Sequence, residues 1–340
     1  MWPFGPALVA LGVAGGIIAL AGTRLVVLTD RLADRTGLGE AVMGGVFLGA
    51  VTSLPGITAS VSAAAQGFPR LALANALGGI AAQTAFLAIA DLAYRKANLE
   101  HAAASVPNML WGALLIALLA GLLVLMVGPD VDFAGIHPMT PLLFLAYLLG
   151  ARLVRRAREE PMWMPRVTDA TAPDVPARES FAGGGASAWV GLLMAAILVI
   201  AAGWVSTRAG IAIVARSSLS ETAVGALVLA LVTSLPELVT SVAAVRHGAL
   251  TLAVGNVLGG NAFDTLFAAA ADVAYRDGSL YHAAGPPELA LAAVTILMTA
   301  VLLLGMLRRE RSGLGNIGFE SVTVLVVYAV TVVMVLGRSG

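Results

Sequence analysis

Long apolar runs separated by short polar breaks dominate the chain. Most of these runs reach the roughly 20 residues that an α-helix needs to cross the hydrocarbon core of a bilayer. None shows the two-residue alternation of a membrane β-barrel, so the pattern predicts an all-α integral membrane protein. We expect ten transmembrane helices, near residues 6–28, 38–66, 70–94, 106–127, 139–155, 187–208, 219–246, 250–275, 285–306 and 319–337.

The segment 152–186 interrupts this pattern. It opens with four arginines between Arg152 and Arg158, continues with four prolines, and holds the glycine run Gly183–Gly185. A stretch this short and polar does not form a packed core, so we interpret it as a linker. It divides the chain into a first five-helix unit, residues 1–151, and a second, residues 187–340.

The two units are copies of each other. Residues 52–103 and 233–284 align without a gap at an offset of 181 residues, with 27 identities in 52 positions. Matched Pro, Asn, Asp, Tyr, Arg and His residues do not arise from apolar composition alone, so the sequence indicates an internal duplication. The most telling pair of stretches is 52–83 and 233–264, which we call the two repeat motifs.

An odd number of helices in each unit predicts an inverted-topology repeat, in which the two units enter the membrane from opposite sides. Basic residues favour the cytoplasmic side of a membrane. Fourteen of them fall in loops on the side of the linker and five on the other side. We therefore expect a multi-pass protein of the cell (inner) membrane, with a cytoplasmic linker and both termini outside.

Composition narrows the function. The chain is 59% hydrophobic and 12% charged, where a soluble domain has about 25% charged residues, so there is no room for a separate soluble domain. Its formal net charge is zero, and it has no cysteine for disulfides or thiolate metal sites. The first apolar run lacks a charged leader, and we expect a retained span rather than a signal peptide. No phosphate-binding loop, nucleophile–base pair or nucleic-acid signature is present, which argues against an enzyme, a cofactor and an ATP-driven pump.

Each repeat motif opens with Thr-Ser-Leu-Pro. A proline within a helix removes a backbone hydrogen bond and frees a carbonyl oxygen, so Pro55 and Pro236 predict helix breaks. A simple kink is the alternative. The hydroxyl groups of Thr52, Ser53, Thr233 and Ser234, together with freed carbonyls, would give a hard-oxygen cation site.

Two acidic residues lie within these apolar motifs. An intramembrane carboxylate costs roughly 2.5–3.5 kcal/mol to insert, and such residues commonly serve function. We expect Glu237 and Asp264 to bind the cation directly, with Gln83 as the first-half counterpart of Asp264. A protonated acid, or one paired with a buried arginine, is the alternative. For Asn261, a role as ligand and a role as scaffold remain equally open.

The remaining polar and small residues favour structural roles. Glycines allow close helix packing, which we expect for Gly56, Gly78, Gly79, Gly259 and Gly260. Asp91 and Asp272 lie near helix ends and predict interfacial caps or ion pairs, with an ion-entry vestibule as the alternative. The histidines all fall in predicted loops, where we expect them to be solvated.

At these motifs the chain resembles the sodium/calcium exchanger family. Its GTSLPE pattern is similar to Val232–Glu237, and its GN-x-x-G-S-N-x-x-N/D pattern is similar to Gly255–Asp264. The resemblance implies ten helices in inverted repeats, ion sites at the bilayer midplane, and alternating access by sliding of the first helix of each half. The family's large calcium-sensing cytoplasmic domain is absent from this sequence.

The first motif departs from the family pattern. Gly56 stands where the family places a second glutamate, Gln83 replaces the N/D residue, and Gly79 and Gly260 replace the serines. Two carboxylates remain, enough to match one Ca²⁺. We expect the bare Gly56 to leave room for water or a larger ion shell.

The sequence therefore predicts an ion-gradient-driven antiporter, most simply of Ca²⁺ against Na⁺. The alternatives are a proton-coupled or monovalent cation exchanger, and a transport-inactive membrane subunit. The expected partners are membrane lipid and inorganic cations, with a homo-oligomer left open.

Overall fold

The computed structural model describes residues 2–36, 51–94, 98–166, 168, 185–246, 250–310 and 318–337. Within these residues the regular structure is helical, apart from one isolated antiparallel bridge between Phe133 and Ile136. The helices are α1 (Phe4–Thr36), α4 (Leu54–Ala65), α5 (Pro69–Ala93), α6 (Leu99–Ala103), α7 (Val106–Val127), α8 (Thr140–Glu159), α9 (Gly185–Arg216), α10 (Glu221–Ala223), η2 (Val224–Leu229), α11 (Ala230–Thr233), α12 (Leu235–Arg246), α13 (Leu250–Ala274), η3 (Leu280–Ala283), α14 (Pro286–Arg308) and α15 (Phe319–Gly337).

These helices coincide with the apolar segments of the sequence. The first part of the segment predicted at 38–66 lies outside the described residues. The described part begins at Val51 and breaks at Ser53 before α4 starts. Short helices that the hydropathy pattern does not reveal, α6 and η3, occupy matching loops of the two halves.

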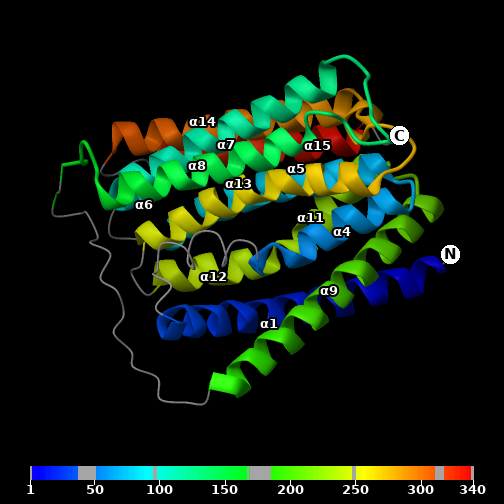
Figure 1. The fold of residues 1–340 in the computed structure, drawn as a ribbon, viewed down its shortest axis with the longest axis horizontal. Helices are drawn as coiled ribbons and strands as arrows, with labels where there is room; N and C mark the ends of the chain where they lie inside the picture. Colours follow the sequence, from blue (N-terminus) through cyan, green and yellow to red (C-terminus); the bar gives the residue numbers. More distant parts are fainter. Residues whose placement is uncertain are drawn as a thin grey trace.

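The helices are arranged in layers around α5 and α13 (Figure 1). The long helices α1 and α9 pack against each other along one side of the molecule, and α7, α8, α14 and α15 form the other side. Helices α4, α11 and α12 lie between the α1–α9 pair and the centre. The two repeat motifs therefore meet in the interior, with α4 packed against α5 and α13, and α12 packed against the same two helices.

Burial follows this arrangement. The apolar window of α5 is almost entirely covered by other helices, whereas α1 and α15 expose most of theirs. Exposed leucine and valine side chains along outer helices are what a hydrocarbon environment accommodates. Among the described residues, six helices are long and apolar enough to cross a membrane, or seven if the bent pair Glu221–Thr233 and Leu235–Arg246 counts as one span. The protein is therefore an all-helical, multi-pass membrane protein.

Several helices of the motif region are not regular. The segment η2 is a π-helix, a wide turn that often accompanies functional sites. It packs against α5 at very close range, because a Cβ added to Gly78 would lie 2.4 Å from the Cα of Ala226. The two helices can approach this closely only because residue 78 has no side chain.

The ends of the chain and the ends of the linker lie at opposite ends of the helix layers. In Figure 1, α1 begins and α15 ends at the right, while α8 ends and α9 begins toward the left. Of the segment predicted as a linker, residues 152–159 continue α8 and residues 185–186 begin α9, while residue 167 and residues 169–184 lie outside the described residues.

Candidate cation-binding site

Each motif helix breaks at a serine. Helix α11 ends at Thr233, Ser234 is a turn, and α12 starts at Leu235 with a bend of 49°. The first half repeats this at Ser53, where α4 starts with Pro55 in its first turn. The expected break is present, but it lies at the serine and not at the proline. Each proline belongs to the first turn of the next helix, where it gives up no hydrogen bond.

A long helix from the opposite half crosses each break at a glycine. A Cβ on Gly22 of α1 would lie 2.5 Å from the ring of Pro236, and one on Gly203 of α9 would lie 2.8 Å from the carbonyl oxygen of Pro55. Gly22 and Gly203 are themselves related by the 181-residue offset. Thr207 of α9 also donates a hydrogen bond of 3.2 Å to the carbonyl oxygen of Ala59. Both breaks are therefore covered in the same way.

The centre of the site is the buried carboxylate of Asp264 in α13. Its Oδ1 accepts a hydrogen bond of 2.5 Å from the hydroxyl of Ser53, and its Oδ2 accepts one of 2.8 Å from Nε2 of Gln83. The same Gln83 nitrogen donates to the hydroxyl of Ser234 at 3.1 Å. Four residues predicted from the two motifs thus form one network, and it joins the two halves of the chain.

Glu237 lies beside this network in the first turn of α12. Its side chain is 9% exposed, it accepts a hydrogen bond from the hydroxyl of Thr52, and it interacts electrostatically with Asp264. Its Oε2 atom is buried and has no hydrogen-bond partner within the described residues. An acceptor left unpaired in the interior is costly, so this oxygen is suited to a cation.

Two further buried acceptor oxygens in the motif helices are unpaired within the described residues: Oε1 of Gln83 and Oδ1 of Asn261. The amide nitrogen of Asn261 donates to the hydroxyl of Thr84 at 3.1 Å and, at 3.5 Å, to the carbonyl oxygen of Ile80. Asn261 therefore ties α13 to α5 and still presents an acceptor. Hard cations such as Ca²⁺ and Na⁺ bind carboxylate, amide and hydroxyl oxygens of this kind.

The remaining predicted ligand, Thr233, is buried at the end of α11. Its hydroxyl contacts the side-chain oxygen of Asn75 at 3.4 Å and the carbonyl oxygen of Ala230 at 3.3 Å. Asn75 in turn donates to the carbonyl oxygen of Gly56 at 3.1 Å and to the hydroxyl of Ser60 at 2.9 Å. These contacts fix the backbone around both breaks.

Gly56 does not leave open space, and our expectation of room for water there is wrong. A Cβ at position 56 would lie 2.4 Å from Cε2 of Phe267, whose ring occupies the volume beside the glycine. Phe267 comes from α13, one turn beyond Asp264, and is itself buried. An aromatic ring from the second half thus fills the place where the family pattern has a carboxylate in the first.

The other motif glycines differ from one another. Gly78 and Gly259 lie against the backbone of Ala226 and the ring of Trp111, and a Cβ on Gly79 would have only the hydroxyl of Ser234 within 4 Å, at 3.6 Å. Gly260 was expected to serve close packing, but no atom lies within 4 Å of a Cβ placed there. Space for a serine side chain therefore exists at 260, where the family pattern has one.

Tyr147 of α8 is a site residue that motif analysis missed. It is fully buried, its hydroxyl has no hydrogen-bond partner within the described residues, and it interacts electrostatically with Asp264. Its ring packs against Trp111 and Phe263. A signal was present in the sequence, because the 181-residue offset places Tyr147 on Tyr328.

Asp91 and Asp272 are caps, but they are fully buried and not at an exposed interface. Asp272 accepts hydrogen bonds from the backbone nitrogens of Leu280 at 2.8 Å and His137 at 2.9 Å, and from the hydroxyl of Thr140 at 2.6 Å. No ion pair among the described residues includes either aspartate. They stabilise the loops after α5 and α13 and lie apart from the site at the breaks.

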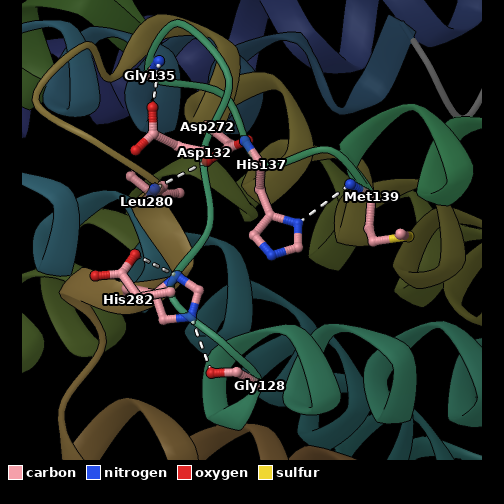
Figure 2. Close-up of polar contacts among 9 residues, drawn as sticks. Gly128, Asp132, Gly135, His137, Met139, Asp272, Leu280 and His282 are labelled. Atoms are coloured by element: carbon pink, nitrogen blue, oxygen red, sulfur yellow. Dashed lines mark hydrogen bonds and ion pairs between the residues drawn. The ribbon is translucent and has the colours of Figure 1, made fainter.

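The histidines are not simply solvated, which corrects our expectation. His101 and His137 are buried, and His247 lies outside the described residues. Figure 2 shows that His137 accepts a hydrogen bond of 3.1 Å from the backbone nitrogen of Met139. Its ring stacks on His282 at 5.7 Å. Burial lowers the pKa of His137, which favours the neutral imidazole.

No group of three or more His, Asp or Glu side chains in the described parts of the chain is placed to hold a metal ion. The site at the breaks thus has two carboxylates, Glu237 and Asp264, supplemented by amide and hydroxyl oxygens.

Comparison with known proteins gives the same picture. The family model "Sodium/calcium exchanger protein" matches residues 6–151 and 187–337. A protein named as antiporter CaxA from Alkalimonas amylolytica is 30% identical over 124 residues, which cover 36% of this chain and 39% of that protein. The match therefore spans about two fifths of this relative's own length.

Solved structures of the sodium-calcium exchanger NCX_Mj share the fold. One, soaked with Na⁺ and Sr²⁺, superimposes with a TM-score of 0.62 at 17% identity and covers 97% of this chain and 98% of that one. Another, soaked without Na⁺ and Ca²⁺, gives a TM-score of 0.59 at 17% identity over 98% and 99% of the two chains. With the family model matched in both halves, the chain belongs to the sodium/calcium exchanger family of membrane cation antiporters and is a transporter, not an enzyme.

Proposed function

We propose that this protein is a secondary active antiporter that exchanges Ca²⁺ for Na⁺ by alternating access at one site between its two halves. The proposal takes the ten helical segments as membrane spans and the units 1–151 and 187–340 as an inverted repeat. The transported ions are the only non-protein species it requires, and their gradients supply the energy.

The observation that carries the proposal is the network around Asp264. Ser53 and Gln83 come from the first motif, and Ser234 and Asp264 from the second. Both serines lie at helix breaks, where backbone carbonyls are also released. A site held by both halves can be exposed to one side or the other when the halves move against each other.

Charge supports the choice of ions. Glu237 and Asp264 are buried and interact with each other, and no ion pair in the described part of the chain neutralises either of them. Two carboxylates match one Ca²⁺ or two Na⁺. Because both occupants satisfy the same two charges, they compete for the site, and competition at one site is the basis of exchange.

One observation favours a second candidate, a proton-coupled or monovalent cation exchanger. The ring of Phe267 fills the space beside Gly56, so the site lacks the carboxylate that the family pattern supplies there. Fewer charged ligands lower the affinity for a divalent ion more than for a monovalent ion or a proton.

Flux through the purified protein in liposomes tests the proposal. Ca²⁺ uptake that depends on an opposing Na⁺ gradient is the expected result. Na⁺ or H⁺ flux without Ca²⁺ movement would favour the second candidate. Silence with every cation, from protein shown to be folded, would leave only the transport-inactive subunit.

We further propose that the linker is cytoplasmic and that both termini face outward. The chain has no cysteine, so single cysteines at two exposed positions, Glu160 and Asp130, can be labelled separately. Glu160→Cys should react with a membrane-impermeant maleimide only from the cytoplasmic side, and Asp130→Cys only from the outer side. The reverse pattern would invert the assigned orientation.

A further inference from the structure

A second group of buried carboxyls lies at the end of α5, away from the network around Asp264. Asp91 belongs to the last turn of α5, Glu100 to α6, and Glu320 to the first turn of α15. Their side chains are 0%, 1% and 0% exposed. Three carboxyls so deeply buried need either protons or a counter-charge.

Part of this group is conventionally satisfied. Asp91 accepts hydrogen bonds of 2.8 Å from the backbone nitrogen of Leu99 and from the hydroxyl of Ser321. The Ser321 hydroxyl also lies 3.4 Å from Oε1 of Glu100. Oε1 of Glu320 accepts from the amide of Asn98. Asp91 and one oxygen of each glutamate therefore have partners.

The other oxygen of each glutamate does not. Oε2 of Glu100 and Oε2 of Glu320 are buried and unpaired within the described residues. The two side chains are nevertheless in hydrogen-bonding contact with each other. Two carboxylates cannot bond to each other, because neither has a hydrogen to donate. One proton on either carboxyl group lets that group donate a hydrogen bond to the other.

Within the described residues, no counter-charge takes the place of that proton. No ion pair among the described residues includes Asp91, Glu100 or Glu320. On α6, His101 turns to Thr168 and to the backbone oxygen of Arg309. The two arginines at the end of α14 have other partners: Arg308 pairs with Glu310, and Arg309 donates to the carbonyl oxygens of Arg166 and His101.

A metal ion fits the group less well than a proton. No set of three or more carboxylate or imidazole groups in the described residues is arranged to hold one. The backbone also encloses Glu320 tightly, because a Cβ on Gly305 would lie 2.6 Å from Cγ of Glu320.

The matching position in the other half shows that the two glutamates are not needed for the cap. The 181-residue offset places Asp91 on Asp272, and there the same bonds recur, from Leu280 and Thr140. Glu100 corresponds to Tyr281, and Glu320 to Met139. Figure 2 shows this second cap with Asp272 and Leu280, and its partners are backbone groups and a threonine. The cap of the second half thus forms without the two acids that the first half contains.

We propose that Glu100 and Glu320 together form a proton-binding site, distinct from the transport site, in which one shared proton joins α6 to α15. Loss of that proton leaves two carboxylates facing each other next to Asp91 and loosens the contact. The site lies at the end of the molecule where His101 contacts Thr168, so it links the protonation state of the protein to the packing of that end.

The direction of the pH effect follows from burial. Desolvation, and then the charges of Asp91 and Glu320, raise the pKa of Glu100 well above its usual range. Between the ordinary glutamate value and the raised one, the folded protein binds more protons than the unfolded protein. The stability contributed by the pair is therefore complete in acid and is lost as the pH rises through this window.

Infrared spectroscopy of the purified protein tests the proposal directly. Wild type should show the C=O stretch of a protonated carboxylic acid near neutral pH, and both Glu100→Gln and Glu320→Gln should lose this component. A glutamine at either position donates its amide N–H to the remaining carboxylate, so each variant can fold without the proton. Glu159→Gln is the matched control, because Glu159 is exposed and pairs with Arg155.

Thermal unfolding provides a second, independent readout. The unfolding temperature of wild type and of Glu159→Gln should fall as the pH rises above the ordinary glutamate range, and Glu100→Gln should flatten this dependence. Should Glu320→Gln not fold, Glu100→Gln alone carries both measurements. An unchanged infrared component and an unchanged pH slope in Glu100→Gln would overturn the proposal. A metal site at this pair would also overturn the proposal. It would be revealed if Ca²⁺ raised the unfolding temperature of Glu237→Gln but not that of the double variant Glu237→Gln with Glu100→Gln.

Discussion

The two repeat motifs have similar backbone geometry but differ in charge. Both break at a serine, begin a new helix with proline, and lie beneath a glycine of a long helix from the other half. Both acids, Glu237 and Asp264, belong to the second motif, while the first has Gly56 and Gln83 in their places. The duplication has thus kept the geometry in both copies and the anionic ligands in one.

The first motif has not lost its connection with the site. Its Ser53 and Gln83 donate to Asp264, so its polar groups hold the acid of the other half in place. In return, Phe267 from the second half fills the space beside Gly56. What one half lacks is compensated by contacts with the other half, and neither motif forms the site without its partner.

The largest effect is expected from removing either acid. Glu237→Gln and Asp264→Asn should each reduce cation flux on the order of 100-fold, because a bound cation then lacks a matching charge in a buried site. Flux in liposomes measures this, with Glu159→Gln as an exposed-acid control. Wild-type rates in both variants would remove the proposed site.

The next largest effect is expected from placing a carboxylate at position 56, where the family pattern has one. Gly56→Glu alone should destabilise the protein by about 1–3 kcal/mol, because the new side chain meets the ring of Phe267. Combined with Phe267→Ala, it should gain room and bind Ca²⁺ about tenfold more tightly than wild type. Phe267→Ala alone is the matched control and should show no gain. Equal Ca²⁺ affinity in the folded double variant and in this control would show that position 56 does not face the ion.

A smaller loss is expected at the first-half donor Ser53. Its hydroxyl binds a charged oxygen of Asp264, and a bond of this kind contributes about 1.5–3 kcal/mol. Part of this stabilisation is shared with the bond from Gln83, so Ser53→Ala should weaken cation binding by about threefold to tenfold. The control is Ser62→Ala, a change of the same kind in α4 outside the network. Identical affinities for the two variants would separate Ser53 from the site.

The smallest effect is expected at Gly260, where a Cβ meets no atom within 4 Å. Gly260→Ser should change the free energy of unfolding by less than about 0.5 kcal/mol. Gly78→Ser introduces the same side chain against the backbone of Ala226 and should unfold the protein at much lower temperature. Thermal unfolding compares the two. Similar losses in both variants would show that the space at 260 is not available.

The sequence alone predicted the helical membrane fold. A long apolar run without two-residue alternation can satisfy its backbone hydrogen bonds in lipid only as a helix. It also predicted the residues that meet at the breaks, since Thr-Ser-Leu-Pro and the acids recur at one offset. Extending that offset would also have revealed Gly22 with Gly203 and Tyr147 with Tyr328.

Contacts between distant segments were beyond sequence reasoning. Nothing near Gly56 in the chain shows that Phe267 fills the space beside it, and the glycine on its own suggested an open volume. Glu100 and Glu320 are 220 positions apart and belong to no motif. The buried histidines were missed for a related reason, because a loop position does not show whether other segments cover it.

Ca²⁺ binding to the purified protein tests the central claim most directly. A titration should show saturable binding to wild type, displacement by added Na⁺, and loss of binding in both Glu237→Gln and Asp264→Asn. Saturable, Na⁺-sensitive binding that persists in both folded variants would contradict the claim that the two acids of the second motif form the cation site.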